Sequence, residues 1–230
     1  MEDLAIENVT AETTMLALVG PDSGTILGLT TSHGHQDSLT AHSVQLGGVD
    51  VLAVEQPLGT LSRYWLITSP DSATGLWQHL TEAGAVPLGA TAMDAARVNF
   101  GVPEFGPELG EPYNPLEAGL IGSVDFAKGC YIGQEVIARL DTHQQVQKYL
   151  VSLIFDAYTT VSPGDELLQG GKQVGTVTSV APEPLDGVLK GLGYVKAAAA
   201  TLGANLEVAG SEKGSAEILS LAQPYGPPKD

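Results

Sequence analysis

The sequence predicts an α+β protein that ends in a small antiparallel barrel or sandwich. In residues 1–145, short apolar runs bounded by Gly and Pro, typical of strands, alternate with segments of helical periodicity. In residues 146–230, short strand-like segments follow one another closely with turn residues between them. That second pattern is typical of a small barrel or sandwich. We therefore divide the chain into two domains, residues 1–145 and 146–230.

Composition excludes several classes of protein. The chain has 230 residues, 43% of them hydrophobic, which is enough for a packed core. Its 10 basic and 27 acidic residues give a net charge of −17, which disfavours binding to duplex DNA or to an anionic membrane. The single cysteine, Cys130, excludes an intramolecular disulfide and fits a reducing compartment. With no basic signal region and no long apolar run, the chain is expected to be cytoplasmic, with no direct nucleic-acid or membrane partner.

The first part of the chain contains one hairpin signal and one clear helix signal. Gly47-Gly48 separates two apolar stretches, as in a tight β-hairpin. Ser69 and Pro70 suit the start of a helix, and Gly84 suits the position just beyond its end. The expected elements are strands at 15–19, 44–46, 49–54 and 64–67 and helices at 22–30, 70–82 and 91–98.

After residue 98 the chain continues with a long segment of weak periodicity, residues 99–129. Its apolar residues favour a functional loop over disorder. A helix is expected after Gly133, because apolar residues then recur at helical spacing. The tail, residues 224–230, has three prolines and is expected to fray. The expected barrel strands are 149–155, 172–180, 192–195 and 206–208.

Reactive groups gather just before the helix that follows Gly133. Cys130 is the only thiol, and Lys128 lies two residues before it. The positive end of the helix dipole and the lysine both favour a thiolate, whereas Glu135 opposes it. The alternative is that Cys130 is a small buried hydrophobe, as free cysteines often are. Both interpretations stay open at this point.

The segment Lys128-Gly129-Cys130-Tyr131-Ile132-Gly133-Gln134-Glu135 resembles the motif K-G-C-[FY]-x-G-Q-E. That motif is typical of the YgfZ family of folate-binding proteins, which are related to the T protein (aminomethyltransferase) of the glycine cleavage system. The resemblance extends from Leu4 to about Val195. It includes residues 18–21, 97–103, 114–120, 136–139 and 175–179.

The resemblance implies an intertwined α+β, aminomethyltransferase-like folate-binding domain followed by a C-terminal β-barrel. It implies tetrahydrofolate, or another folate derivative, as cofactor. It further implies an accessory role in assembling or maintaining iron–sulfur clusters, with client enzymes, tRNA-modifying ones among them, or assembly proteins as partners. The implied functional pair is Cys130 and Lys128, with further motif positions Gly129, Tyr131, Gly133, Gln134 and Glu135. The implied folate contacts are Arg97, Asn99, Lys128, Tyr131 and Arg139.

Two departures from the related T protein bear on function. An R-L-E-A-G segment there supplies a glutamate that holds the pterin ring, and the matching residue here is Asn99. A neutral amide loses charge-assisted hydrogen bonds, which disfavours the alternative of a tetrahydrofolate-dependent aminomethyl or one-carbon transferase. Family members also continue further on the N-terminal side, so the first domain is expected to be shortened. A second alternative is therefore an interaction module without a folate pocket.

Two further groups of polar residues are assigned no chemistry. His33-Gly34-His35 has the form of a metal-binding pair, but no third ligand lies at a suitable spacing. An acidic series in the long loop is interpreted as a solvated face rather than as a source of an acid/base carboxylate. That series is Glu104, Glu108, Glu111 and Glu117.

Overall fold

The computed structural model describes residues 4–29, 40–143, 146–156, 159–210 and 214–222. Compact packing divides the chain into two units, residues 1–88 and 89–230. The second unit includes the helix and the long loop that precede the barrel. His33 and His35 and the C-terminal tail lie outside the described residues. No helix within the described ranges combines the length and apolarity needed to cross a membrane.

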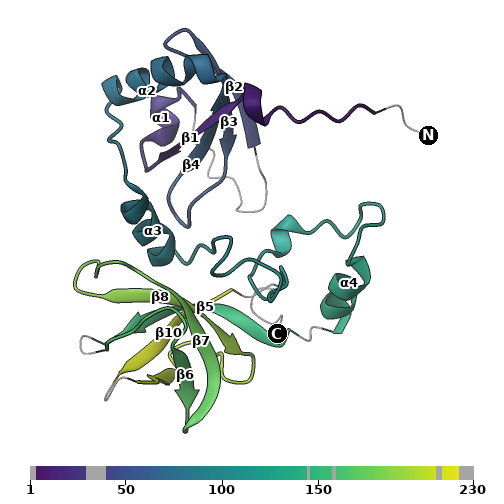
Figure 1. The fold of residues 1–230 in the computed structure, drawn as a ribbon, viewed down its shortest axis with the longest axis vertical. Helices are drawn as coiled ribbons and strands as arrows, with labels where there is room; N and C mark the ends of the chain where they lie inside the picture. The colour runs from purple at the N-terminus through teal and green to yellow at the C-terminus, as the bar shows by residue number, and fades with distance from the viewer. Residues whose placement is uncertain (1–3, 30–39, 144–145, 157–158, 211–213, 223–230) are drawn as a thin grey trace. The chain divides into compact units, whose positions relative to one another are not determined.

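The first unit is an antiparallel sheet of four strands in the order β1-β4-β3-β2 (Figure 1). Gly47 and Gly48 form the β2–β3 turn with φ angles of 57° and 82°. Such positive φ values suit glycine in a tight hairpin turn, which confirms the predicted hairpin. The strands are β1 (Thr14–Val19), β2 (Thr40–Leu46), β3 (Val49–Glu55) and β4 (Arg63–Thr68).

Helical segments η1 (Thr10–Glu12), α1 (Ser23–Ile26), η2 (Pro70–Ser72) and α2 (Ala73–Glu82) complete this unit. Leu76 and Leu80 of α2 are buried in one cluster with the inward residues of the sheet. The helix expected at 22–30 is shorter in the structure, since Gly28 takes a φ of 67° that ends it. Ser69 does not cap α2 through its side chain; its hydroxyl bonds that of Ser72 at 2.9 Å.

The second unit contains the predicted barrel, closed by six strands in the order β10-β5-β8-β7-β6-β9. All paired neighbours are antiparallel, and the interior is a single apolar cluster. The strands at 166–169 and 215–221 were not predicted from the sequence. The barrel strands are β5 (Lys148–Phe155), β6 (Glu166–Gln169), β7 (Lys172–Val180), β8 (Leu189–Lys196), β9 (Asn205–Val208) and β10 (Ser215–Leu221).

Helix α3 (Ala90–Asn99) packs against β8 (Figure 1). Val98 near its end is fully buried with Leu150, Leu192 and Tyr194 of the barrel strands. The long loop follows, with one short turn, η3 (Ile121–Ser123), before α4 (Gln134–His143). Gly133 has a φ of 90°, and its carbonyl accepts the first α4 hydrogen bonds, so the helix begins where the sequence predicts.

Candidate functional site

The C-terminal end of α3 is fixed by its backbone. The N–H of Gly101 donates to the carbonyl of Val98 at 3.2 Å, and the N–H of Val102 donates to that of Arg97 at 2.8 Å. This pair of bonds, with a φ of 71° at Gly101, is a Schellman motif. A Cβ at Gly101 would lie 2.7 Å from Ser152 Oγ, so only glycine fits this approach to β5.

Asn99, in this last turn, presents one unpaired acceptor. Its Nδ2 donates to the carbonyl of Ala95 at 2.7 Å, which fixes the orientation of the amide. Its Oδ1 is buried and accepts no hydrogen bond from the described residues. A buried acceptor without a donor costs about 1–3 kcal/mol. The arrangement therefore suits a ligand that brings an N–H or O–H donor to this atom.

Arg97 lies two residues earlier and is 8% exposed. Its guanidinium pairs with three carboxylates: Asp94 at 2.6 Å, Glu104 at 2.9 Å and Glu108 at 3.0 Å. It also donates to Ser179 Oγ on β7 at 3.0 Å. Its guanidinium thus joins two partly exposed carboxylates, of Asp94 and Glu104, to two buried groups, Glu108 and Ser179.

The acidic series of the long loop was expected to form a solvated face, and for Glu108 this expectation is wrong. Its side chain is fully buried. Besides Arg97, its carboxylate accepts from Ser179 Oγ at 2.6 Å and from the N–H of Glu104 at 3.1 Å. Its backbone carbonyl accepts from the hydroxyl of Tyr194 at 2.9 Å. A buried arginine needs a carboxylate as its partner, and Glu108 in the Pro/Gly-rich loop supplies it. The presence of a glutamate in that loop, 11 residues after Arg97, is the sequence signal that was missed.

Glu117 is a second buried member of the same acidic series, at 5% exposure. Its carboxylate accepts from the N–H of Asn114 at 3.2 Å and lies 4.0 Å from Lys148 Nζ. The same lysine sits over the ring of Tyr113, which stacks on Tyr194 at 3.9 Å between centroids. Burial raises the pKa of the Glu117 carboxyl, and the Asn114 N–H and Lys148 oppose that rise to a smaller extent.

The raised pKa of Glu117 predicts a pH dependence of stability. The folded state holds this proton to higher pH than the unfolded chain does, so the free energy of unfolding should fall as pH rises from 4.5, the ordinary value, through the raised pKa. Glu117→Gln should lack this decline, because an amide does not titrate. Urea unfolding of both proteins across this pH range measures the difference. Parallel stability curves would contradict the assignment.

The motif segment forms an exposed loop before α4. Asp125 Oδ1 accepts from the N–H groups of Ala127 and Lys128, at 2.8 and 3.1 Å. The Lys128 ammonium lies over the Tyr131 ring, 4.7 Å from its centroid, in a cation–π contact. Cys130 lies between them in sequence and is exposed. Its thiol is therefore open to reagents and contributes nothing to a core.

Replacement of Cys130 by serine should leave stability nearly unchanged. The side chain is exposed, so we expect the free energy of unfolding to change by less than about 0.5 kcal/mol. The thiol of the folded wild-type protein should react fully with iodoacetamide. Urea unfolding and mass spectrometry check the two results. Protection of the thiol, or a loss of more than about 1 kcal/mol from burial of an unpaired hydroxyl, would indicate a core position.

The predicted site residues fall into two groups. Arg97 and Asn99 share the last turn of α3, whereas Lys128 and Tyr131 belong to the exposed loop. The other motif positions lie in or beside that loop and at the start of α4: Gly129, Gly133, Gln134 and Glu135, with Arg139 exposed further along α4. Among the described residues, no hydrogen bond or ion pair joins the two groups.

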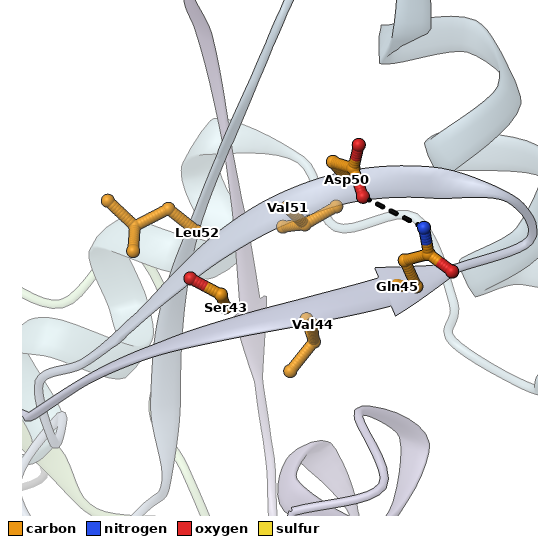
Figure 2. A pocket seen from close by; sticks show the side chains of 6 residues that line it. All are labelled: Ser43, Val44, Gln45, Asp50, Val51 and Leu52. Carbon is orange, nitrogen blue, oxygen red and sulfur yellow. Dashed lines mark hydrogen bonds between the residues drawn. The ribbon is translucent and has the colours of Figure 1, made fainter.

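Two hollows lie elsewhere, and neither contains a predicted site residue. Figure 2 shows the larger, about 390 Å³, on the β2–β3 hairpin, where Gln45 Nε2 donates to Asp50 Oδ1 at 3.0 Å. The Asp50 carboxylate is therefore already hydrogen-bonded within this hollow. The other residues that line the hollow are Ser43, Val44, Val51 and Leu52. The smaller, about 120 Å³, lies between Phe100, Gly101 and strands β5 and β10, with room for only a few water molecules.

Comparisons with known proteins place this arrangement in a family. Residues 1–128 match the GCVT N-terminal domain, and residues 148–222 match the glycine cleavage T-protein C-terminal barrel domain. The aminomethyltransferase of Streptomyces avermitilis is 33% identical over 90% of this chain and 59% of its own length. An Arabidopsis thaliana protein, named provisionally as a chloroplastic transferase, is 32% identical over 98% of this chain and 52% of its own.

A solved structure shows the same fold. The glycine cleavage system aminomethyltransferase T of Bartonella henselae superposes with a TM-score of 0.75 at 20% identity, over 91% of this chain and 59% of that one. This chain thus spans a little over half the length of these relatives. With its α+β first part and its closed six-stranded barrel, the chain belongs to the family defined by the GCVT N-terminal domain and carries the barrel domain of glycine cleavage T-proteins.

Proposed function

We propose that the protein binds tetrahydrofolate or a derivative of it. The observation that carries this proposal is the buried Oδ1 of Asn99, which has no hydrogen-bond donor among the residues that the structure describes. Asn99 stands where the sequence resemblance puts the pterin-holding residue, and a pterin edge carries N–H donors. A donor from that edge would satisfy the orphan acceptor and remove its desolvation cost. Because one of the two Nδ2 hydrogens is already bonded to the carbonyl of Ala95, the amide would contribute one acceptor, Oδ1, and no more than one N–H donor to the ligand.

Charge limits where the rest of a folate can bind. Folates are anions and the chain carries −17, so a local cation must attract the ligand. Three carboxylates compensate Arg97, whereas Lys128 and Arg139 are exposed. We assign the anionic part of the folate to these two cations, with Tyr131 as a stacking surface. Lys128→Glu should then weaken binding.

The thiol points to an accessory role of the YgfZ type. Cys130 is exposed beside the Lys128–Tyr131 pair, as a group that reacts with a partner must be. We propose that the protein supports the assembly or maintenance of iron–sulfur clusters in client enzymes, including tRNA-modifying ones. Complementation of a strain that lacks the family member, by the wild type and by Cys130→Ser, tests this role. Restoration by both proteins would contradict it.

The second candidate function is a tetrahydrofolate-dependent aminomethyl or one-carbon transferase. The names of the relatives, aminomethyltransferases among them, favour it. The neutral Asn99 disfavours it, because charge-assisted bonds to the pterin are lost. Formation of methylenetetrahydrofolate from an aminomethyl donor would establish the transferase instead.

Calorimetry with 5-formyltetrahydrofolate tests the binding proposal directly. We expect a micromolar dissociation constant for the wild type, about −8 kcal/mol. Asn99→Ala should weaken binding roughly tenfold, since that corresponds to about 1.4 kcal/mol for one hydrogen bond. Asn205→Ala, at an exposed position on β9, is the matched control and should bind as the wild type does. Absence of binding to the wild type would instead favour an interaction module without a folate pocket.

A further inference from the structure

We propose that Ser179, on barrel strand β7, is a positioning residue for the pterin contact at Asn99. It would act through Arg97 and Glu108, so that the barrel fixes the position of the C-terminal turn of α3. This inference rests on the proposed folate binding. It concerns residues that need not touch the ligand.

Arg97, Glu108 and Ser179 form a closed ring of three hydrogen bonds. Arg97 Nη1 donates to Glu108 Oε2 at 3.0 Å, Arg97 Nη2 donates to Ser179 Oγ at 3.0 Å, and Ser179 Oγ donates to Glu108 Oε1 at 2.6 Å. All three residues are less than 9% exposed. Ser179 is both acceptor and donor in this ring, so its loss removes two bonds at once.

The barrel fixes Ser179 in turn. The pairing of β7 with β8 shifts register between Val177 and Ser179, which is a β-bulge. A bulge redirects the side chains of its strand, and such irregularities recur beside functional sites. Within the described ranges the buried hydroxyl of Thr178, in the bulge, has no hydrogen-bond partner, whereas the Ser179 hydroxyl accepts one bond and donates another.

The ring determines where Asn99 lies, because Arg97 and Asn99 share one helical turn. The carbonyl of Arg97 also accepts the Val102 N–H of the Schellman motif, so side chain and backbone hold this turn together. A ligand hydrogen bond requires its partner within about 0.5 Å of the productive position. A small shift of Arg97 would carry the Asn99 amide out of that range.

The test compares neighbouring hydroxyls on β7. Ser179→Ala should weaken 5-formyltetrahydrofolate binding roughly tenfold, and Thr178→Val, which removes a hydroxyl outside the ring, should leave it unchanged. The fragment p-aminobenzoylglutamate, which lacks the pterin, should bind all these variants with equal affinity. All affinities are measured below the unfolding transition of each variant.

A double-mutant cycle decides whether Ser179 acts through Asn99. In an Asn99→Ala background, Ser179→Ala should cause no further loss of affinity. Ser179→Cys, whose thiol is only a weak donor and a weak acceptor, should behave as Ser179→Ala does and serves if that variant does not fold. Two outcomes would overturn the positioning role and leave the proposed folate binding intact. One is that the losses of affinity from the two substitutions add in the double variant; the other is that the ring variants bind normally while Asn99→Ala binds weakly. No binding by the wild type would overturn the proposed function as well.

Discussion

Arg97→Ala is expected to lower the free energy of unfolding by about 3–5 kcal/mol, the cost of leaving a buried charge without its partner. Glu108 is fully buried and would keep only a hydroxyl and a backbone N–H as donors. Urea unfolding at neutral pH measures the loss. The transition should remain cooperative if the variant folds, because the apolar barrel interior is unchanged.

Asp94→Ala is the matched control for that prediction. Asp94 pairs with the same guanidinium, but its side chain is 41% exposed. Exposed ion pairs contribute about 0.2–1 kcal/mol, so the variant should lose no more than that. Equal losses from both replacements would mean that Glu108 is not the group that needs Arg97.

Gly193→Ala should destabilise the barrel by about 1–3 kcal/mol through overpacking. A Cβ at this position of β8 would lie 2.7 Å from the carbonyl oxygen of Thr176 on β7 and 3.2 Å from Leu153 Cδ1. The nearest atom is backbone, so relief requires a shift of the strands. Thermal unfolding and urea unfolding should both register the loss.

Gly110→Ala provides the comparison for the barrel glycine. A Cβ there would meet only Pro112 Cδ, at the ordinary contact distance of 3.7 Å. Without a clash, alanine restricts the unfolded chain and should be neutral or slightly stabilising, by up to about 1 kcal/mol. A loss at Gly110 as large as at Gly193 would show that glycine itself, rather than the close approach of β7, matters in this unit.

Local signals in the sequence predicted the elements whose causes are local. Gly47-Gly48 specifies its hairpin through positive φ angles, and Gly133 marks the start of α4. The α+β class with a closed C-terminal barrel is confirmed, and each predicted barrel strand is present in the structure. Strands β6 and β10 were missed because β6 has only four residues and polar residues interrupt the apolar pattern of β10, so that pairing with their neighbours makes them strands.

The candidate site was less predictable because its contacts are non-local. Ser179 follows Arg97 by 82 residues, and no pattern within α3 indicates that partner. Glu108 and Glu117 were assigned to a solvated face because acidic residues are mostly exposed. The resemblance did single out Asn99 and Cys130. The structure adds that the amide oxygen of Asn99 is buried without a donor from the described part of the chain and that Cys130 is exposed.

The bonds between the α3 end and the barrel also constrain the order of folding. They join residues 71, 82 and 86 positions apart: Glu108 with Ser179, Arg97 with Ser179, and Glu108 with Tyr194. Closing such loops costs chain entropy before any contact is gained, so we expect strands β7 and β8 to pair before α3 docks. In the folded chain the last turn of α3 is held by the bonds of Arg97 to Glu108 and Ser179, whereas its first residues are exposed. The amide hydrogens of that last turn should therefore exchange with solvent more slowly than those at the start of the helix.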